Sequence, residues 1–446
     1  MPFMDFANLV KLVEKEAKGF EYELFLLRRK NLKISTENGE FDKISTAEDF
    51  GLGVRILKDQ RMGFAYTSDL SEDSLRNLVN QLKEITQYLP PDEGNRFKET
   101  FEESKVVSPY DREAVEKPVE EKIETVISFE REVLKSDPRV VGTRETTFTE
   151  TVFEVHLKNS YGVDFGYEGT AYSIVTSALA ESPKGDRNIV WSYRASRLLK
   201  ELNLQDLKEE LLFKLLQTLD PEPFESQVIN VVFTPETFAL LLETFSELFL
   251  GENALKGKTP LLGKEGGQVA SEILTLVDDG TLPNGFSTHP YDDEGTPQQK
   301  TVLIEKGTFK GFLHSLYSAA KLGKKPTGNG YRSSFSTPPS CAISNFYVEP
   351  VEGSLEEFIQ TEKKVFLVTD LMGLHTADTV SGDFSLGASG VIFENGQRKQ
   401  AVRGVTVAGN FLKLLNQIEK IGSDLKFYGN VGSPSLLVKN ITVGGI

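Results

Sequence analysis

Apolar residues follow two successive patterns in the middle of the chain, between residues 228 and 251. Residues 228–233 form a β-branched, largely apolar run that is typical of a half-buried strand. Thr234 is a favourable helix N-cap, and Pro235 suits the first helical position because an N–H there would have no partner within the helix. The pattern therefore predicts a strand that leads directly into a helix over residues 235–250, with Gly251 placed to end it.

The predicted helix presents one apolar stripe with two carboxylates beside it. Its large apolar residues recur at spacings of three and four, which places on one face Phe238, Leu241, Leu242, Phe245, Leu248 and Phe249. Glu243 and Glu247 stand one turn apart next to this stripe. Such a pair can act as acid and base or hold a cation, so both residues are candidate catalytic groups. In an acidic protein, a solvated helix edge is the simpler interpretation.

The first 90 residues show the patterns of two helices and several short strands. One helix is predicted over residues 6–13, and another follows Ser71 until Pro90 and Pro91 end it. Asn38-Gly39 is a strong hairpin signal, and the basic residues 28–31 are predicted to form another turn. These turns separate predicted strands at residues 22–27, 32–34, 51–57 and 62–66. The chain is thus predicted to begin as a curled antiparallel sheet.

A polar connection without periodicity follows at residues 92–118. Helices are then predicted over residues 123–133 and 198–219. Between them the alternation predicts strands at residues 144–157, 161–167, 172–181 and 188–194. Pro221 and Pro223 interrupt any regular structure and mark a domain boundary. We therefore predict an N-terminal α+β domain over residues 1–222.

The composition changes after this boundary, where Gly, Pro, Thr and Ser become more frequent and the predicted strands are short. Only two helices stand out, one over residues 235–250 and one over residues 411–421, which Asn410 caps and Gly422 ends. Residues 223–446 are predicted to form a mostly-β domain with a few helices. The predicted fold class is α+β, an N-terminal sheet-and-helix region followed by this mostly-β domain.

Composition and charge restrict the classes of function. The chain has 446 residues and a formal net charge of −16, which disfavours direct binding of nucleic acid because such binding depends on Lys and Arg. No run reaches the roughly 18 apolar residues that a membrane span needs, and the N-terminus lacks the cleavage site of a signal peptide. The single cysteine, Cys341, excludes an intrachain disulfide and fits a reducing cytoplasm.

Few residues suggest a chemical role. The four histidines have no metal-ligand spacing. His375 lies in a predicted loop that can line a pocket, although a loop histidine held by hydrogen bonds is the simpler interpretation. Asn329 and Gly330 lie in a glycine-rich loop, which permits close approach of another backbone such as an extended peptide. Acidic runs at residues 277–281 and 291–297 lack the ligand alternation of a calcium loop, and we interpret them as turns at strand ends.

Several ordered motifs in the second half carry a resemblance to a known family. They occupy residues 269–281, 291–315, 326–332, 380–397 and 405–410, and residues 48–63 agree in overall pattern. Together these motifs resemble the PmbA/TldD family. In that family, TldD-type chains form a metallopeptidase with TldE/PmbA-type chains, and members have also been described as modulators of DNA gyrase.

The resemblance also locates a metal motif. TldD-type chains bind zinc through His-Glu-x-x-x-His on the helix that opens the C-terminal domain, and through a cysteine near the C-terminus. Counted without gaps from residue 269, the motif falls on residues 242–247, where only Glu243 matches and Leu242 and Glu247 replace the histidines. Residues 427–434 contain no cysteine. Ligands five residues apart lie about 140° apart on a regular helix, so a metal motif here needs a local distortion.

These differences make the chain similar to the TldE/PmbA branch. The resemblance implies the non-metal subunit of a cytoplasmic TldD/TldE metallopeptidase that acts on unfolded peptides or small proteins. Zinc, with its activated water and a glutamate base, is expected in a TldD-type partner and not in this chain. Asn329, Gly330 and His375 of this chain would position the peptide substrate. A homodimer is the other expected assembly.

Two alternatives stay open. The chain can instead be a protein-binding regulator, acting on DNA gyrase or a toxin–antitoxin component without a role in hydrolysis. It can also be a peptidase itself, using Glu243, Glu247 and a loop histidine. The three functions require different zinc contents of this chain. They also differ in whether peptide hydrolysis is expected to rise when the chain is mixed with a TldD-type partner.

Overall fold

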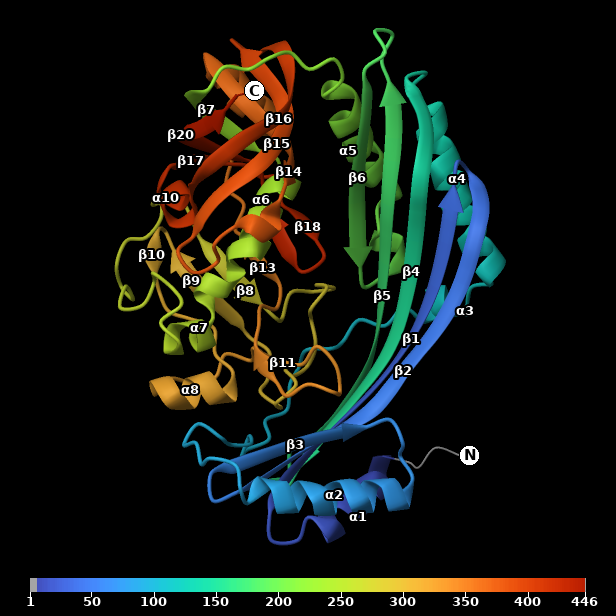
Figure 1. The fold of residues 1–446 in the computed structure, drawn as a ribbon, viewed down its shortest axis with the longest axis vertical. Coiled ribbons are helices and arrows are strands. Elements are labelled where there is room, and N and C mark those ends of the chain that lie inside the picture. The colour runs from blue at the N-terminus through green and yellow to red at the C-terminus, as the bar shows by residue number, and fades with distance from the viewer. Residues whose placement is uncertain (1–5, 446) are drawn as a thin grey trace.

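The computed structural model describes residues 6–445 and has the predicted α+β fold (Figure 1). Its N-terminal half forms one antiparallel sheet of six strands, several of which are long and curved (Figure 1). In sheet order these are β3 (Arg61–Thr67), β2 (Glu40–Lys58), β1 (Glu21–Glu37), β4 (Val140–Asn159), β5 (Asp164–Glu181) and β6 (Arg187–Ser196).

Two predicted interruptions of these strands are wrong. The basic residues 28–31 lie inside β1, where Arg29 is paired with Asp49 of β2 and Phe153 of β4. Residues 168–171 likewise continue β5. A cluster of charges favours a turn, but the side chains of a strand alternate between two faces. Both faces of the sheet are partly exposed to solvent at this point. Arg28 and Arg29, which point to opposite faces, are therefore both partly exposed, and the strand continues.

Helices pack on one face and at one end of this sheet. α4 (Val119–Lys135) and α5 (Leu204–Gln217) bury one hydrophobic cluster against the strands, and α1 (Phe6–Glu16) and α2 (Glu72–Thr86) bury another near β2 and β3. A 3₁₀ turn, η1 (Leu199–Glu201), precedes α5. The predicted helices are confirmed, except that α5 begins at Leu204 and not at residue 198, because Asn203 is its N-cap. The segment predicted to be irregular contains the short helix α3 (Arg112–Glu116).

The C-terminal half contains two six-stranded sheets. The first, in sheet order, is β16 (Gln397–Asn410), β15 (Asp383–Glu394), β14 (Lys364–Met372), β7 (Gln227–Phe233), β20 (Leu436–Gly444) and β17 (Ile418–Ile421). Since β16 also pairs with β20, this sheet closes on itself. The second is β10 (Thr308–Phe309), β9 (Lys300–Glu305), β8 (Leu276–Asp279), β13 (Phe346–Val348), β19 (Val431–Ser433) and β18 (Lys426–Tyr428). A separate pair comprises β11 (Gly330–Tyr331) and β12 (Ser340–Cys341).

The first helix predicted in this half ends earlier than expected. α6 (Pro235–Phe245) packs between the two sheets and gives way to a 3₁₀ turn, η2 (Ser246–Phe249). Gly251 begins the short helix α7 (Gly251–Leu255) instead of ending α6. A Cβ at Gly251 would lie 2.3 Å from Nδ1 of His314, so close packing requires glycine at this position.

The second predicted helix, residues 411–421, is correct only in its first half. α10 (Phe411–Asn416) is capped by the Asn410 side chain, as predicted, but the following residues form β17. Ile418 pairs there with Val438 of β20, which buries an isoleucine that also fits a helical pattern. The remaining helices of this half, which the sequence pattern did not predict, are α8 (Leu316–Leu322), α9 (Leu355–Thr361) and the 3₁₀ turn η3 (Leu374–Thr376).

The two halves meet through buried side chains. Phe25 and Leu27 of β1 belong to the same hydrophobic cluster as Tyr291 and Phe335 of the C-terminal half. That residues 1–222 and 223–446 are separate domains stays a prediction. No helix within residues 6–445 has the length and apolar character needed to cross a membrane.

Candidate functional site

β7 leads directly into α6, as the sequence predicts. The Thr234 hydroxyl accepts a hydrogen bond from the Thr237 N–H at 3.4 Å, and Pro235 occupies the first helical position. The apolar stripe faces inward, and exposed fractions do not exceed 1% for Phe238, Leu241, Leu242 and Phe245. α6 is therefore a core helix between two sheets.

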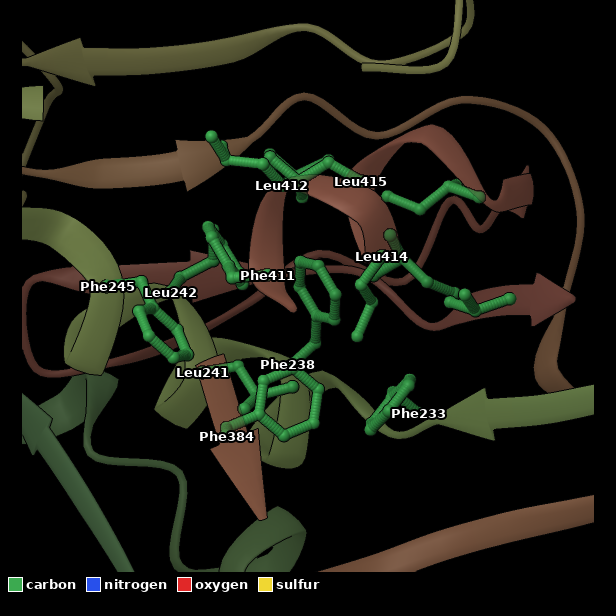
Figure 2. Close-up of a cluster of buried hydrophobic side chains, with 14 of the residues drawn as sticks. Phe233, Phe238, Leu241, Leu242, Phe245, Phe384, Phe411, Leu412, Leu414 and Leu415 are labelled. Carbon is green, nitrogen blue, oxygen red and sulfur yellow. The ribbon is translucent and has the colours of Figure 1, made fainter. Parts of the chain in front are cut away.

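Leu242, which the sequence comparison predicts to stand at the first histidine of the TldD-type motif, is fully buried. Figure 2 shows its side chain among those of α6 and α10, which point toward one another. Nearby, the ring of Phe245 stacks on that of Phe411 with their centroids 4.7 Å apart. A metal ligand at residue 242 would place a polar imidazole inside this apolar cluster, where an unpaired polar group is costly.

Glu243 and Glu247 lie on the surface, as expected for a solvated helix edge. Partial burial raises the pKa of the Glu243 carboxyl. Tyr193 lies in the edge strand β6, and its pKa is raised first by burial and then by the charge of Glu243. Glu243 therefore lies near this strand. Glu247 lies on η2, outside α6, and its carboxylate accepts a hydrogen bond from the Thr379 hydroxyl at 3.3 Å. Within residues 6–445, no three His, Cys, Asp or Glu side chains are grouped so that they could hold a metal ion.

The three substrate-binding candidates lie in two different environments. His375 is exposed on η3, which contacts α6. Asn329 is 1% exposed, and its amide nitrogen donates a hydrogen bond to the Asp278 carboxylate at 2.8 Å. Gly330 is also buried, and a Cβ there would lie 2.1 Å from the Glu294 carboxylate. Asn329 and Gly330 thus pack against acidic side chains in the interior, and only His375 faces solvent beside α6.

Several acidic residues that the sequence pattern assigns to turns are buried. Exposed fractions are 9% or less for Asp278, Asp292, Asp293 and Glu294. Burial raises the pKa of Asp278 to about 6 and that of Asp293 to about 6. Burial and repulsion by Glu294 raise the pKa of Asp292 as well. The run Asp-Asp-Glu-Gly is typical of an exposed turn, so the sequence contains no signal of this burial.

Two arginines connect this acidic group to the N-terminal sheet. Arg55 of β2 donates a hydrogen bond from Nε to the Glu23 carboxylate at 2.8 Å and lies 3.7 Å from the Glu294 carboxylate. From the other half, the Arg332 guanidinium also pairs with Glu23, and its backbone N–H donates to Asp293 at 2.7 Å. Because the three carboxylates and the side chains of both arginines are buried, the network fixes how the two halves meet.

Two cavities lie along the contact between the halves. One of about 710 Å³ lies between β2, β3 and the helices α7 and α8, and contains Arg55 and Glu294 in its wall. The other, of about 460 Å³, lies against the sheet face that carries Phe25 and Leu27. Neither cavity includes the surface of α6 that bears Glu243 and Glu247. The structure therefore separates the motif position on α6 from the enclosed spaces between the halves.

Comparison with known proteins identifies the class to which this fold belongs. Residues 22–86 match PmbA/TldA metallopeptidase domain 1, residues 112–219 match the central domain of that metallopeptidase, and residues 226–445 match its C-terminal domain. The three matches cover most of the chain, so it belongs to the PmbA/TldD family, as its motifs predict.

Individual relatives extend along almost the whole chain. Metalloprotease PmbA of Escherichia coli O157:H7 is 26% identical, with 95% of this chain and 92% of the relative covered. The crystal structure of TldE from Thermococcus kodakarensis is 26% identical with a TM-score of 0.89, covering 99% of this chain and 100% of that one. A Thermotoga maritima protein described as a candidate modulator of a DNA gyrase has the same identity, TM-score and coverage.

Proposed function

We propose that this chain is the TldE/PmbA-type, non-metal subunit of a cytoplasmic TldD/TldE metallopeptidase that acts on unfolded peptides or small proteins. The observation that carries the proposal is the full burial of Leu242 at the position of a metal ligand. Glu247, at the second ligand position, is instead exposed, and its carboxylate accepts a hydrogen bond from Thr379. The similarity to TldE from Thermococcus kodakarensis supports this assignment. Since these residues do not fit a zinc ion, no hydrolytic step is assigned to this chain.

In this proposal the chain completes a substrate cleft whose metal belongs to a TldD-type partner. His375 is exposed on η3, which contacts α6, and we place the peptide contact at this histidine. Asn329 and Gly330 act indirectly, since they pack their loop against Asp278 and Glu294. Without such a partner, a second copy of the chain is the proposed occupant of the same surface.

A second candidate function is a protein-binding regulator with no share in hydrolysis. It is favoured by the description of the Thermotoga maritima protein as a candidate modulator of a DNA gyrase. The formal net charge of −16 opposes a direct action on DNA, so such a regulator would act through a protein. The two functions are separated by what the chain adds to a partner that carries the intact zinc motif.

The test is to mix this chain with a TldD-type chain from the same genome and to follow hydrolysis of an unfolded peptide. We expect a hetero-oligomer on size-exclusion chromatography and hydrolysis well above that of the TldD-type chain alone. Activity equal to that of the TldD-type chain alone would contradict the subunit role and favour the regulator.

A matched pair of variants assigns the chemistry to one subunit. Replacing the motif glutamate of the TldD-type chain with glutamine is expected to abolish hydrolysis, because that carboxylate serves as the general base. The equivalent Glu243→Gln change in this chain is expected to leave the rate unchanged. If Glu243→Gln abolished hydrolysis instead, the chain would be a peptidase in its own right.

A further inference from the structure

The cavity of about 460 Å³ lies between the N-terminal sheet and loops of the C-terminal half. Its floor consists of alternate residues of β1 and β4, which share one sheet face because side chains alternate along a strand. From β1 these are Phe25, Leu27 and Arg29, and from β4 Phe153 and Val155. Its volume lies within the range of about 300–1,000 Å³ that is typical of small-molecule sites.

Arg29 is an unpaired cation in this floor. It is half-buried, and within residues 6–445 its side chain forms no hydrogen bond or ion pair, not even with Asp49, which lies opposite it on β2. The preceding residue, Arg28, points to the opposite face, where its guanidinium lies 3.7 Å from the Glu154 carboxylate. Two adjacent arginines on one strand therefore differ in that only Arg28 has a carboxylate partner. Arg29 is left available to a ligand in the cavity.

Arg197 adds a second positive charge without a counter-ion. It is 1% exposed, and its N–H groups donate only to neutral oxygens, which belong to Ser108, Pro109, Thr170, Phe286 and Thr288. Burial lowers the pKa of Arg197 to about 10, so its guanidinium stays charged at neutral pH. No carboxylate among the described residues pairs with it, in a chain whose net charge is −16.

The other charged groups of the cavity compensate one another. Asp293 is the one carboxylate among its described lining residues, and it accepts a hydrogen bond from the backbone N–H of Arg332, whose guanidinium pairs with Glu23. His289 is neutral, because burial and then the charge of Arg197 lower its pKa to about 3. Within residues 6–445, the charges of Arg29 and Arg197 thus have no carboxylate partner, and the cavity favours an anion.

The remaining wall is aromatic. The Arg197 guanidinium lies over the ring of Phe153, with its Cζ 5.1 Å from the ring centroid. Tyr167 stacks on His289 with ring centroids 5.2 Å apart. Phe25 and Phe286 complete this surface. Apolar walls suit an organic group better than a hydrated inorganic anion, so the ligand combines an apolar body with a negative charge.

We propose that this cavity binds the C-terminal residue of a peptide, with the terminal carboxylate at Arg29 and an apolar side chain against Phe25 and Phe153. Arg197, whose donors are already used, acts on the carboxylate through its charge. The choice of a peptide over another organic acid rests on the proposed function. The site itself rests on the two unpaired arginines and the aromatic wall. The inference therefore adds a recognised end of the substrate to the proposed peptide-handling role.

The test is isothermal titration calorimetry on this chain alone with acetyl-Ala-Ala-Phe and with its C-terminal amide. We expect the acid to bind and the amide to bind roughly tenfold more weakly or worse, since a charge-assisted hydrogen bond is lost. Arg29→Gln is expected to weaken the acid to the level of the amide. Arg28→Gln, on the opposite face of the same strand, is the matched control and is expected to change neither affinity.

Thermal unfolding of each variant, compared with that of the native chain, checks that the variants are folded. Arg29→Lys keeps the charge and is expected to bind the acid more tightly than Arg29→Gln does. Equal affinity for acid and amide, loss of binding in Arg28→Gln, or inorganic phosphate binding as tightly as the acid would each overturn the proposal. Because no partner is present, these outcomes are independent of the mixing experiment, so failure of one proposal is distinguishable from failure of the other.

Discussion

At the scale of single residues, His289 is an ionisable side chain that the fold keeps neutral by burying its ring among aromatic side chains. It stacks on Tyr167 and contacts Phe153 edge to face, and its buried Nδ1 has no hydrogen-bond partner within residues 6–445. Burial and the nearby Arg197 charge lower its pKa to about 3. The cost of protonating this ring inside the protein makes stability depend on pH.

We predict that the stability contributed by His289 falls as the pH falls below 6.5. An unfolded histidine titrates near pH 6.5, well above the folded pKa of His289, so the unfolded chain binds the proton first. The contribution of His289 is fully present above pH 6.5 and falls by up to about 1.4 kcal/mol for each pH unit below it.

The measurement is the free energy of unfolding in urea at pH 7.5 and 5.5, for the native chain and for His289→Asn. The native chain is expected to lose more stability than the variant between these values. His314, whose pKa is also lowered by burial, contributes equally to both proteins. Equal losses in the two proteins would contradict a buried neutral His289.

At the scale of elements, α6 and η2 pack into the core at the position where the resemblance predicts the metal motif of a TldD-type chain. The change to a 3₁₀ turn at Ser246 lies within the segment where ligands five residues apart would need a distortion. Leu242 nevertheless faces the core, while Glu247 faces solvent. The element therefore has an irregular end but presents no pair of ligands to one ion.

We predict that restoring the two histidines does not restore the metal site. In Leu242→His/Glu247→His, the first change exchanges a buried leucine for an imidazole in an apolar cluster, at a cost of about 2–4 kcal/mol. Urea unfolding and zinc titration of this double variant are the measurements, with Glu247→His alone as the control. A stable double variant that binds zinc tightly would contradict the packing role of α6.

The same elements show what the sequence can predict. The start of α6 follows from local chemistry, because Thr234 and Pro235 act within one turn of the helix. Its end depends on distant contacts that no local pattern contains, such as the hydrogen bond from the Thr259 hydroxyl to the Leu248 carbonyl. The continuity of β1 through its basic residues likewise depends on the strands that pair with it on both sides.

The candidate site was predictable to a similar extent. The family motifs pointed to α6 and predicted that Leu242 and Glu247 stand where TldD-type chains have histidines, and the structure adds that Leu242 is buried. The cavity floor was not predictable, because Arg29 and Phe153 lie on strands that meet only in the folded sheet. The burial of Asp292 is another tertiary effect, since it requires the loop at Gly330 to close over the carboxylates.

At the scale of the whole molecule, the N-terminal sheet and the C-terminal half are joined by a charged network and an apolar cluster. Glu23 accepts from Arg55 of its own half and from Arg332 of the other, and Phe25 packs in the cluster that contains Phe335. The cavity proposed to bind a peptide end lies at this contact, while α6 lies within the core of the C-terminal half. The account therefore assigns recognition to this chain and the metal to a partner.

The most direct test of that account is the zinc content of the purified chain, measured by elemental analysis after incubation with equimolar zinc and dialysis. A TldD-type chain with intact His-Glu-x-x-x-His, treated identically, is the positive control and is expected to retain about one zinc per chain. The account predicts that this chain retains far less than one equivalent. A tightly bound stoichiometric zinc in this chain would contradict it.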